Sequence, residues 1–276
     1  MKLENERYRF ECTTKAAEII SLFDKKTKIE YIWSGDSKYW AGRNPILFPI
    51  IGSSFNKKYW FDQQEYTMGN HGFARNSDFT LIETTSDKVV LQLISNDVTR
   101  AQYPFDFTLT VTYQLVENTV MVSYRIVNES LKPMPFAFGL HPAFNCPLTN
   151  DRNFTDYYLE MASDCVLRGH NPKADQGLIK RIGLSYDLFS EYHTLTFNDL
   201  SSPYLSFTDG EHGVGISTVG YNCVAVWSPQ APFICLEPWH LPANKCNEDR
   251  PFIERDASYE LAPKQSFLTA YTISVF

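Results

Sequence analysis

Three short segments of this 276-residue chain hold most of the side chains that could do chemistry. They are residues 69–75 (GNHGFAR), 138–145 (FGLHPAFN) and 235–240 (CLEPWH). Each sets a titratable group among glycine, proline and aromatic residues, and together they supply imidazoles, a carboxylate, a guanidinium and apolar ring faces. This combination is typical of a site that holds a sugar-like small molecule and moves its protons.

Glu237 and His141 are the residues best suited to acid and base roles. Each precedes a proline, which disfavours helical backbone, so we expect both on strands or strand ends. Adjacent strands could then bring the two side chains to one concave face. A salt-bridged surface carboxylate is the alternative for Glu237, but its apolar neighbours favour burial, which would raise its pKa toward that of a useful base. For His141, a buried structural histidine is an equally good interpretation.

Other residues of these segments are candidates for binding. His71 is open to the same two interpretations as His141. Arg43 and Arg75 are either surface charges or donors to sugar hydroxyls or to a phosphate. Four aromatic residues could line the core or pack against the C–H face of a pyranose ring, namely Phe73, Phe144, Trp227 and Trp239.

The sequence lacks the usual signatures of metal and nucleotide sites. The remaining histidines, His170, His193, His212 and His240, have no ligand spacing, and the six cysteines include no Cys-x-x-Cys pair. We expect reduced, mostly buried thiols, no metal and no cofactor, since no phosphate-binding loop is present either.

Composition narrows the class of protein. The formal net charge of -7 and the lack of a long basic cluster disfavour nucleic acid as a partner. The N-terminus has no apolar core of a signal peptide, and no apolar run approaches the length of a membrane span, so we expect a cytoplasmic protein without membrane contact. No repeat or linker interrupts the chain, which predicts a single domain over residues 1–276. The oligomeric state is left open.

The elements that must position these residues are mainly strands. Apolar and polar residues alternate clearly over 107–115 and again over 120–126, which predicts a hairpin turning at Glu117-Asn118. Further strands are predicted over 88–94, 204–207, 213–218, 223–227 and 233–236. The segment 15–23 fits a helix or a strand equally, and a short helical turn is expected near 185–189. The expected class is all-β, a large antiparallel sandwich.

The three segments, taken in order, resemble the aldose 1-epimerase (galactose mutarotase) family, and within it a bacterial branch similar to the LacX protein. The segments 30–33 (EYIW), 39–40 (YW) and 45–52 (PILFPIIG) are also similar to the N-terminal part of that branch. The resemblance runs nearly end to end. It implies the antiparallel supersandwich of the galactose mutarotase type, with the site in a cleft across one sheet.

The resemblance also implies roles for individual residues. His141 is the general acid on the ring oxygen, and Glu237 takes the proton from the C1 hydroxyl. His71, Arg75 and the adjacent Asn70 match the segment that binds the sugar. Arg43 falls where some members carry a substrate-binding arginine. Trp227 and Trp239, chosen for their ring faces and not from the resemblance, complete the expected binding set. The implied activity is interconversion of α and β anomers by ring opening, without a cofactor.

One departure from the family pattern keeps two alternatives open. Relatives often place a sugar-binding aspartate just before a strand like 195–200, where this chain reads EYHT over 191–194, and Glu191 or His193 could substitute. A hexose 6-phosphate is a possible substrate if the arginines bind phosphate. A carbohydrate-binding or sensing protein without catalysis is the other alternative.

Overall fold

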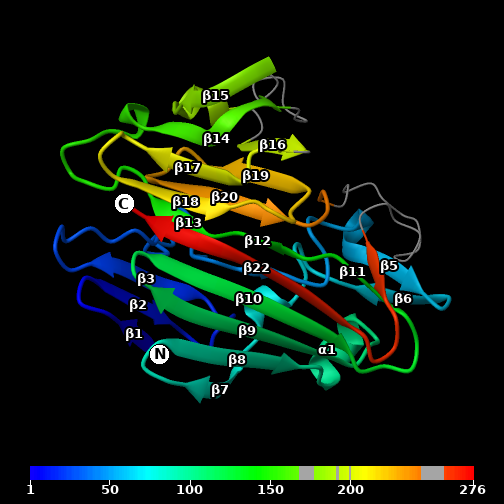
Figure 1. Cartoon of the computed structure of the whole chain (residues 1–276). Helices are drawn as coiled ribbons and strands as arrows, with labels where there is room; N and C mark the ends of the chain where they lie inside the picture. The colour runs from blue at the N-terminus through cyan, green and yellow to red at the C-terminus, as the bar shows by residue number, and fades with distance from the viewer. Residues whose placement is uncertain (168–176, 191–192, 199, 244–257) are drawn as a thin grey trace.

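The computed structural model describes residues 1–167, 177–190, 193–198, 200–243 and 258–276, and of 163–167 and 177–179 only the backbone (Figure 1). The architecture is antiparallel β throughout its sheets, as the alternation predicted. The chain therefore has the all-β, antiparallel class expected from the sequence. None of the described helices is long and apolar enough to cross a bilayer.

The largest sheet in the described part of the chain has nine strands, which Figure 1 shows side by side across the molecule. In spatial order they are β15 (Gly177–Gly183), β14 (Tyr158–Leu167), β17 (Tyr204–Thr208), β18 (Gly213–Ser217), β22 (Ser266–Val275), β10 (Thr119–Asn128), β9 (Phe107–Val116), β8 (Lys88–Ile94) and β7 (Thr80–Thr84). The predicted hairpin joins β9 to β10, and Glu117 in its turn has a φ of 52°, which primed hairpin turns require.

A second sheet of six strands carries the candidate site. It runs in the order β16 (Thr194–Asn198), β19 (Cys223–Trp227), β20 (Phe233–Trp239), β12 (Gly139–Leu140) and β4 (Ile46–Leu47), and β13 (Ala143–Asn145) also pairs with β20. The strands predicted over 223–227 and 233–236 are thus confirmed as β19 and β20.

Smaller elements complete the described structure. A three-stranded sheet contains β1 (Lys2–Glu4), β2 (Tyr8–Cys12) and β3 (Ile19–Asp24), and two ribbons pair β5 (Lys58–Phe61) with β6 (Gln64–Thr67) and β11 (Met134–Phe136) with β21 (Tyr259–Leu261). Helix α1 (Asp97–Gln102) and four 3₁₀ turns, at Phe55–Lys57, Ala74–Asn76, Phe154–Asp156 and Tyr186–Phe189, lie between strands. The last of these confirms the helical turn expected near 185–189.

The ambiguous segment 15–23 contains no helix: residues 19–23 lie in strand β3, and residues 16–17 form a turn before it. Ala16 and Ala17 have φ angles of 54° and 50°, in the left-handed region that an α-helix excludes. Their backbone is held there by tertiary hydrogen bonds, such as that from the Ala16 N–H to the Ser77 carbonyl at 2.7 Å. Packing therefore overrides the strong intrinsic helix propensity of alanine.

Strand β20 is buried on both faces, and this decides where the site lies. Ile234 and Leu236 belong to the main core cluster, which also contains side chains of β9, β10 and β22. Cys235 and Trp239 belong to smaller clusters on the opposite face. Since successive side chains of a strand alternate between faces, Glu237 shares the face of Cys235 and Trp239, away from the main core.

The core is continuous along the chain. The main cluster of buried apolar side chains includes residues from Leu3 to Val275. A single domain over residues 1–276 stays a prediction, which this continuity supports. Four cysteines with described side chains, Cys12, Cys146, Cys223 and Cys235, are buried as expected, whereas the side chain of Cys165 and all of Cys246 lie outside the described residues.

His240 follows β20 and is a buried structural histidine. Its Nε2 lies 2.7 Å from the Thr269 hydroxyl on β22, and its ring centroid lies 4.3 Å from that of Tyr221. Burial lowers the pKa of His240 from 6.5 to about 4. At pH values between 6.5 and about 4, the unfolded chain binds a proton at this residue and the folded chain does not. The free energy of unfolding therefore falls as the pH falls through this range.

We therefore expect His240→Gln to weaken the acid sensitivity of folding. Between pH 7 and 4.5, the free energy of unfolding of the wild type should fall by about 2 kcal/mol more than that of the variant. Urea titrations at both pH values measure this difference. An equal loss in the two proteins would contradict the assignment of a neutral, buried His240.

Candidate active site

The register of the six-stranded sheet places His141 opposite Glu237. Strands β12 and β13 lie on either side of His141 and both pair with β20 in the same register. Continued across the gap between them, that register sets residue 141 against residue 237. The backbone contact persists there, since the Leu236 N–H donates to the Pro142 carbonyl at 3.2 Å. The expectation that both residues lie on strands or strand ends is confirmed.

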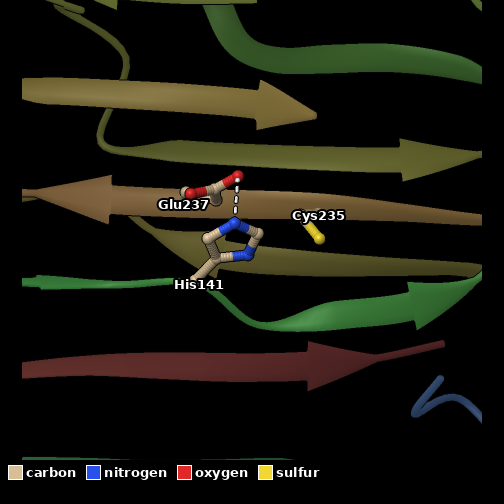
Figure 2. A group of neighbouring side chains, drawn as sticks. All are labelled: His141, Cys235 and Glu237. Carbon is tan, nitrogen blue, oxygen red and sulfur yellow. Dashed lines mark ion pairs between the residues drawn. The ribbon is translucent and has the colours of Figure 1, made fainter. Parts of the chain in front are cut away.

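The two side chains form a close, buried pair. His141 Nε2 lies 3.4 Å from Glu237 Oε1, and the side chains are 10% and 2% exposed (Figure 2). The remaining polar atoms, His141 Nδ1 and Glu237 Oε2, are buried without a hydrogen-bond partner among the described residues. Because unpartnered buried polar atoms are costly, they mark a place where a polar ligand would be favoured.

Burial opposes charge on both members of the pair. It raises the pKa of Glu237 well above its ordinary value, against the smaller lowering effects of the nearby Trp239 indole and Arg75. It lowers the pKa of His141, and the nearby Arg75 and His71 add to that effect. The neutral pair and the ion pair differ only in which of the two residues carries one shared proton. Because burial disfavours charge, it favours the neutral pair, in which this proton is on Glu237.

His71 presents a hydrogen-bond donor beside this pair. Its Nδ1 accepts a hydrogen bond from the Gly52 N–H at 3.0 Å, which leaves the proton of the neutral ring on Nε2. Burial, assisted by Arg75, lowers the pKa of His71 to about 3, so the ring stays neutral near pH 7. Its centroid lies 5.9 Å from that of His141.

Arg75 supplies the positive charge of the site. It lies in the 3₁₀ turn Ala74–Asn76, and its pKa is lowered by burial while Glu18 and Glu237 act in the opposite direction. The turn follows Gly72, whose φ of 75° and close approach to Phe48 admit no side chain. The loop is therefore built to turn His71 and Arg75 toward the same cavity.

A cavity of about 280 Å³ gathers these groups, a volume near the lower end for small-molecule sites. Its described lining consists of Trp40, Asn70, His71, Arg75, His141, Thr194, Trp227, Glu237 and Trp239. Seven of the eight predicted site residues are thus brought together. Trp40 and Thr194 also line the cavity but were not predicted as site residues. Phe73 and Phe144, for which core and sugar packing were both open, lie in the main core.

Arg43 is the predicted site residue that the described lining does not include. Its Nη1 lies 4.0 Å from Glu18 Oε2, and its backbone N–H donates to Glu18 Oε1 at 2.8 Å. Glu18 also acts electrostatically on Arg75, so this carboxylate interacts with both arginines. Of the two residues considered as aspartate substitutes, His193 is exposed, and Glu191 lies outside the described residues. The adjacent Thr194 reaches the cavity instead.

Small residues keep this face of the sheet open. Residues 139 and 143 on the His141 side and residue 225 on the β19 side are glycine, alanine and alanine. A Cβ on Gly139 would lie 2.7 Å from the Trp239 ring. The absence of larger side chains beside Glu237 leaves room for a ligand against the carboxylate.

Cys235 completes a cluster of potential metal ligands with His141 and Glu237, whose donor atoms lie within 4.8 Å of one another (Figure 2). Ligand atoms of one zinc ion lie about 3.6 Å apart, given bonds of about 2.0–2.3 Å. Burial, with Glu237 nearby, raises the pKa of the Cys235 thiol well above its ordinary value, so without a metal this residue is a neutral thiol.

Solved structures similar to this chain share its architecture, and a family model matches its sequence. The family model of aldose 1-epimerase matches residues 1–247, a span that contains all eight predicted site residues. The plasmid-encoded protein LacX of Lactococcus lactis subsp. lactis is 29% identical, over 100% of this chain and 99% of that protein.

Two solved structures are similar over their full length. A galactose mutarotase related enzyme from Lactobacillus acidophilus has a TM-score of 0.92 at 28% identity, covering 100% of this chain and 97% of that one. A galactose mutarotase-like protein from Lactobacillus casei has a TM-score of 0.90 at 28% identity, covering 100% and 99%.

The glycines of the His71 loop provide a matched pair of variants. A Cβ on Gly72 would lie 2.1 Å from the Phe48 carbonyl oxygen, whereas one on Gly69 meets nothing within 4 Å. We expect Gly72→Ala to lower the free energy of unfolding by more than about 2 kcal/mol and Gly69→Ala to change it by less than about 0.5 kcal/mol. Chemical denaturation of the two variants measures both. Equal stabilities would contradict the described loop.

Proposed function

The chain belongs to the aldose 1-epimerase family, and from that premise we propose that it interconverts the α and β anomers of a neutral hexose, with His141 and Glu237 as the acid and base. Membership makes the protein an isomerase. The identity of the sugar and the roles of the individual residues are the proposal, and the geometry of the cavity supports them.

The observation that carries the proposal is the 3.4 Å separation of His141 Nε2 and Glu237 Oε1. In mutarotation, the hydroxyl oxygen that loses a proton and the ring oxygen that gains one are bonded to the same carbon, C1. The acid and the base must therefore lie close together and on the same side of the substrate. Glycosidases instead hold two carboxylates about 5–9.5 Å apart, and the described lining contains one carboxylate.

The proposed reaction moves one proton through the sugar. The form of the pair that reacts is the ion pair, with the shared proton on His141. Glu237 takes the proton of the C1 hydroxyl while His141 donates its proton to the ring oxygen, so that the C1–O bond of the ring breaks and a C1 carbonyl forms. Rotation about C1–C2 and the reverse transfers close the other anomer and restore both residues. Opening leaves Glu237 and His141 neutral, the state that their burial favours, so the site stabilises the ring-opened form.

The remaining lining residues suit a ring with several hydroxyls. His71 offers its Nε2–H and Arg75 its guanidinium donors. Asn70 Oδ1 accepts a hydrogen bond from the Ser53 hydroxyl at 2.9 Å, which turns its amide nitrogen into the available donor. Trp227 and Trp239 add ring faces for the C–H face of a sugar. We assign these five residues to substrate binding.

The charge of the lining favours a neutral sugar over a hexose 6-phosphate. Arg75 is the one arginine in the described lining, and Glu18 and Glu237 already act on its charge. A phosphate would need more local positive charge than this.

Glu237→Gln keeps the shape of the side chain and removes the base. We expect it to lower the rate of anomer exchange, followed by NMR on freshly dissolved α-glucose and α-galactose, by about 10²-fold or more, because a positioned base contributes about 10²–10⁴-fold. Sugar affinity should change little. Glu211→Gln, at an exposed carboxylate, is the control.

Retained exchange in Glu237→Gln would refute the role of this residue. A wild-type protein that binds sugars but does not accelerate their exchange would instead be a binding protein.

Competition by inorganic phosphate tests whether the substrate is a neutral hexose or a hexose 6-phosphate. We expect millimolar phosphate to leave exchange of the neutral hexose unchanged, and glucose 6-phosphate to be a poorer substrate than glucose in kcat/KM. The measurement is the same NMR exchange assay with each sugar. Competition by phosphate together with a preference for the phosphorylated sugar would move the assignment to a hexose-6-phosphate 1-epimerase.

A further inference from the structure

We propose that Trp40 is a positioning residue that holds the imidazole of His141 in its working orientation. Trp40 lies outside the three motif segments, and neither the sequence patterns nor the family match assigns it a role. The proposal rests on the proposed function of His141 as the acid. It concerns how the proton reaches the ring oxygen, which requires a fixed direction from Nε2.

Hydrogen bonding alone does not fix the His141 ring. The orientation of a catalytic imidazole is usually set by a hydrogen bond at the nitrogen that does no chemistry. Here Nδ1 is buried without a partner among the described residues. The contact of Nε2 with Glu237, at 3.4 Å, is long for a hydrogen bond and must give way to the substrate during the reaction.

Packing against neighbouring rings fixes the orientation of the imidazole instead, and the Trp40 indole provides the ring face that it packs on. The Trp40 and His141 centroids lie 4.8 Å apart with an interplanar angle of 31°. Trp227 and His71 lie at 5.4 and 5.9 Å, with interplanar angles of 76° and 86°, so they meet the imidazole nearly edge to face. Rotation of the imidazole about its Cβ–Cγ bond would bring it against the indole of Trp40.

The chain around Trp40 is built to hold this indole in place. The Trp33 Nε1–H donates to the Trp40 carbonyl at 2.8 Å, and the Trp40 N–H donates to the Asp36 carbonyl at 2.9 Å. Phe233 lies parallel to the indole within 19°, at 5.8 Å. Gly42 lies against its edge, where a Cβ would be 2.5 Å from Cζ2. A rigid ring cannot yield to that contact as a flexible side chain would.

The test compares three substitutions by anomer-exchange kinetics. Trp40→Leu keeps an apolar cover but removes the flat ring, and we expect kcat to fall about 10- to 100-fold, the cost of a small misplacement of a catalytic group, with KM little changed. Trp40→Phe restores a ring and should recover most of the loss. Trp60→Leu, the same substitution at an exposed tryptophan of β5, should leave kcat unchanged.

Gly42→Ala displaces the indole without removing it. We expect this variant to lower kcat in the same way, which also keeps the test available if Trp40→Leu does not fold. In proton NMR, the ring current of Trp40 should shift the ring protons of His141 upfield in the wild type and in Trp40→Phe, and this shift should shrink in Trp40→Leu and Gly42→Ala.

Other outcomes separate this proposal from the proposed function. A rise in KM with unchanged kcat in Trp40→Leu would show that Trp40 binds sugar and does not position His141. Equal loss in Trp40→Phe and Trp40→Leu would also overturn the proposal. A wild-type protein without exchange activity would refute the proposed function itself, whereas the NMR shifts would still report whether Trp40 orients the imidazole.

Discussion

The antiparallel register between β20 and the segment of β12 and β13 is the constraint on which the rest of the site depends. It sets His141 against Glu237 on the face of the second sheet that points away from the main core. A shift of β20 by one residue would turn Glu237 to the other face, away from His141, because the side-chain period of a strand is two. The apolar residues of β20, Ile234 and Leu236, resist that shift because they would leave the core between the sheets. The same packing that stabilises the fold thus fixes the geometry of the pair.

Burial is the second constraint, and it gives this geometry its chemistry. Burial raises the pKa of Glu237 and lowers that of His141, so the two residues share one proton that can pass between them through a bound sugar. His71 remains a neutral donor because Gly52 fixes its tautomer, and Arg75 offsets the carboxylate. The cavity therefore offers an imidazole, a carboxyl group and directed donors within a small volume, without a free charge that would attract a strongly anionic ligand.

The sequence predicted the all-β class, the hairpin of β9 and β10 and seven residues of the cavity, because alternation and the local chemistry of the motifs are encoded over a few neighbouring residues. Trp40 and Thr194 were missed because their places depend on tertiary contacts, such as the hydrogen bond from Trp33 and the pairing of β16 with β19. Arg43 was expected in the cavity, yet the described lining does not include it, and its backbone N–H donates to Glu18. Helix α1 was also missed, although its signal was present, since Asn96 before Asp97 forms a capping box with Thr99.

A crystal structure of Glu237→Gln with a bound hexose tests the central claim most directly. The account predicts that the anomeric hydroxyl lies within hydrogen-bond distance of the side chain at residue 237, and the ring oxygen within hydrogen-bond distance of His141 Nε2. A sugar bound in this cavity with C1 turned away from both residues, or bound elsewhere on the protein, would contradict the assignment of the pair as the acid and base of mutarotation.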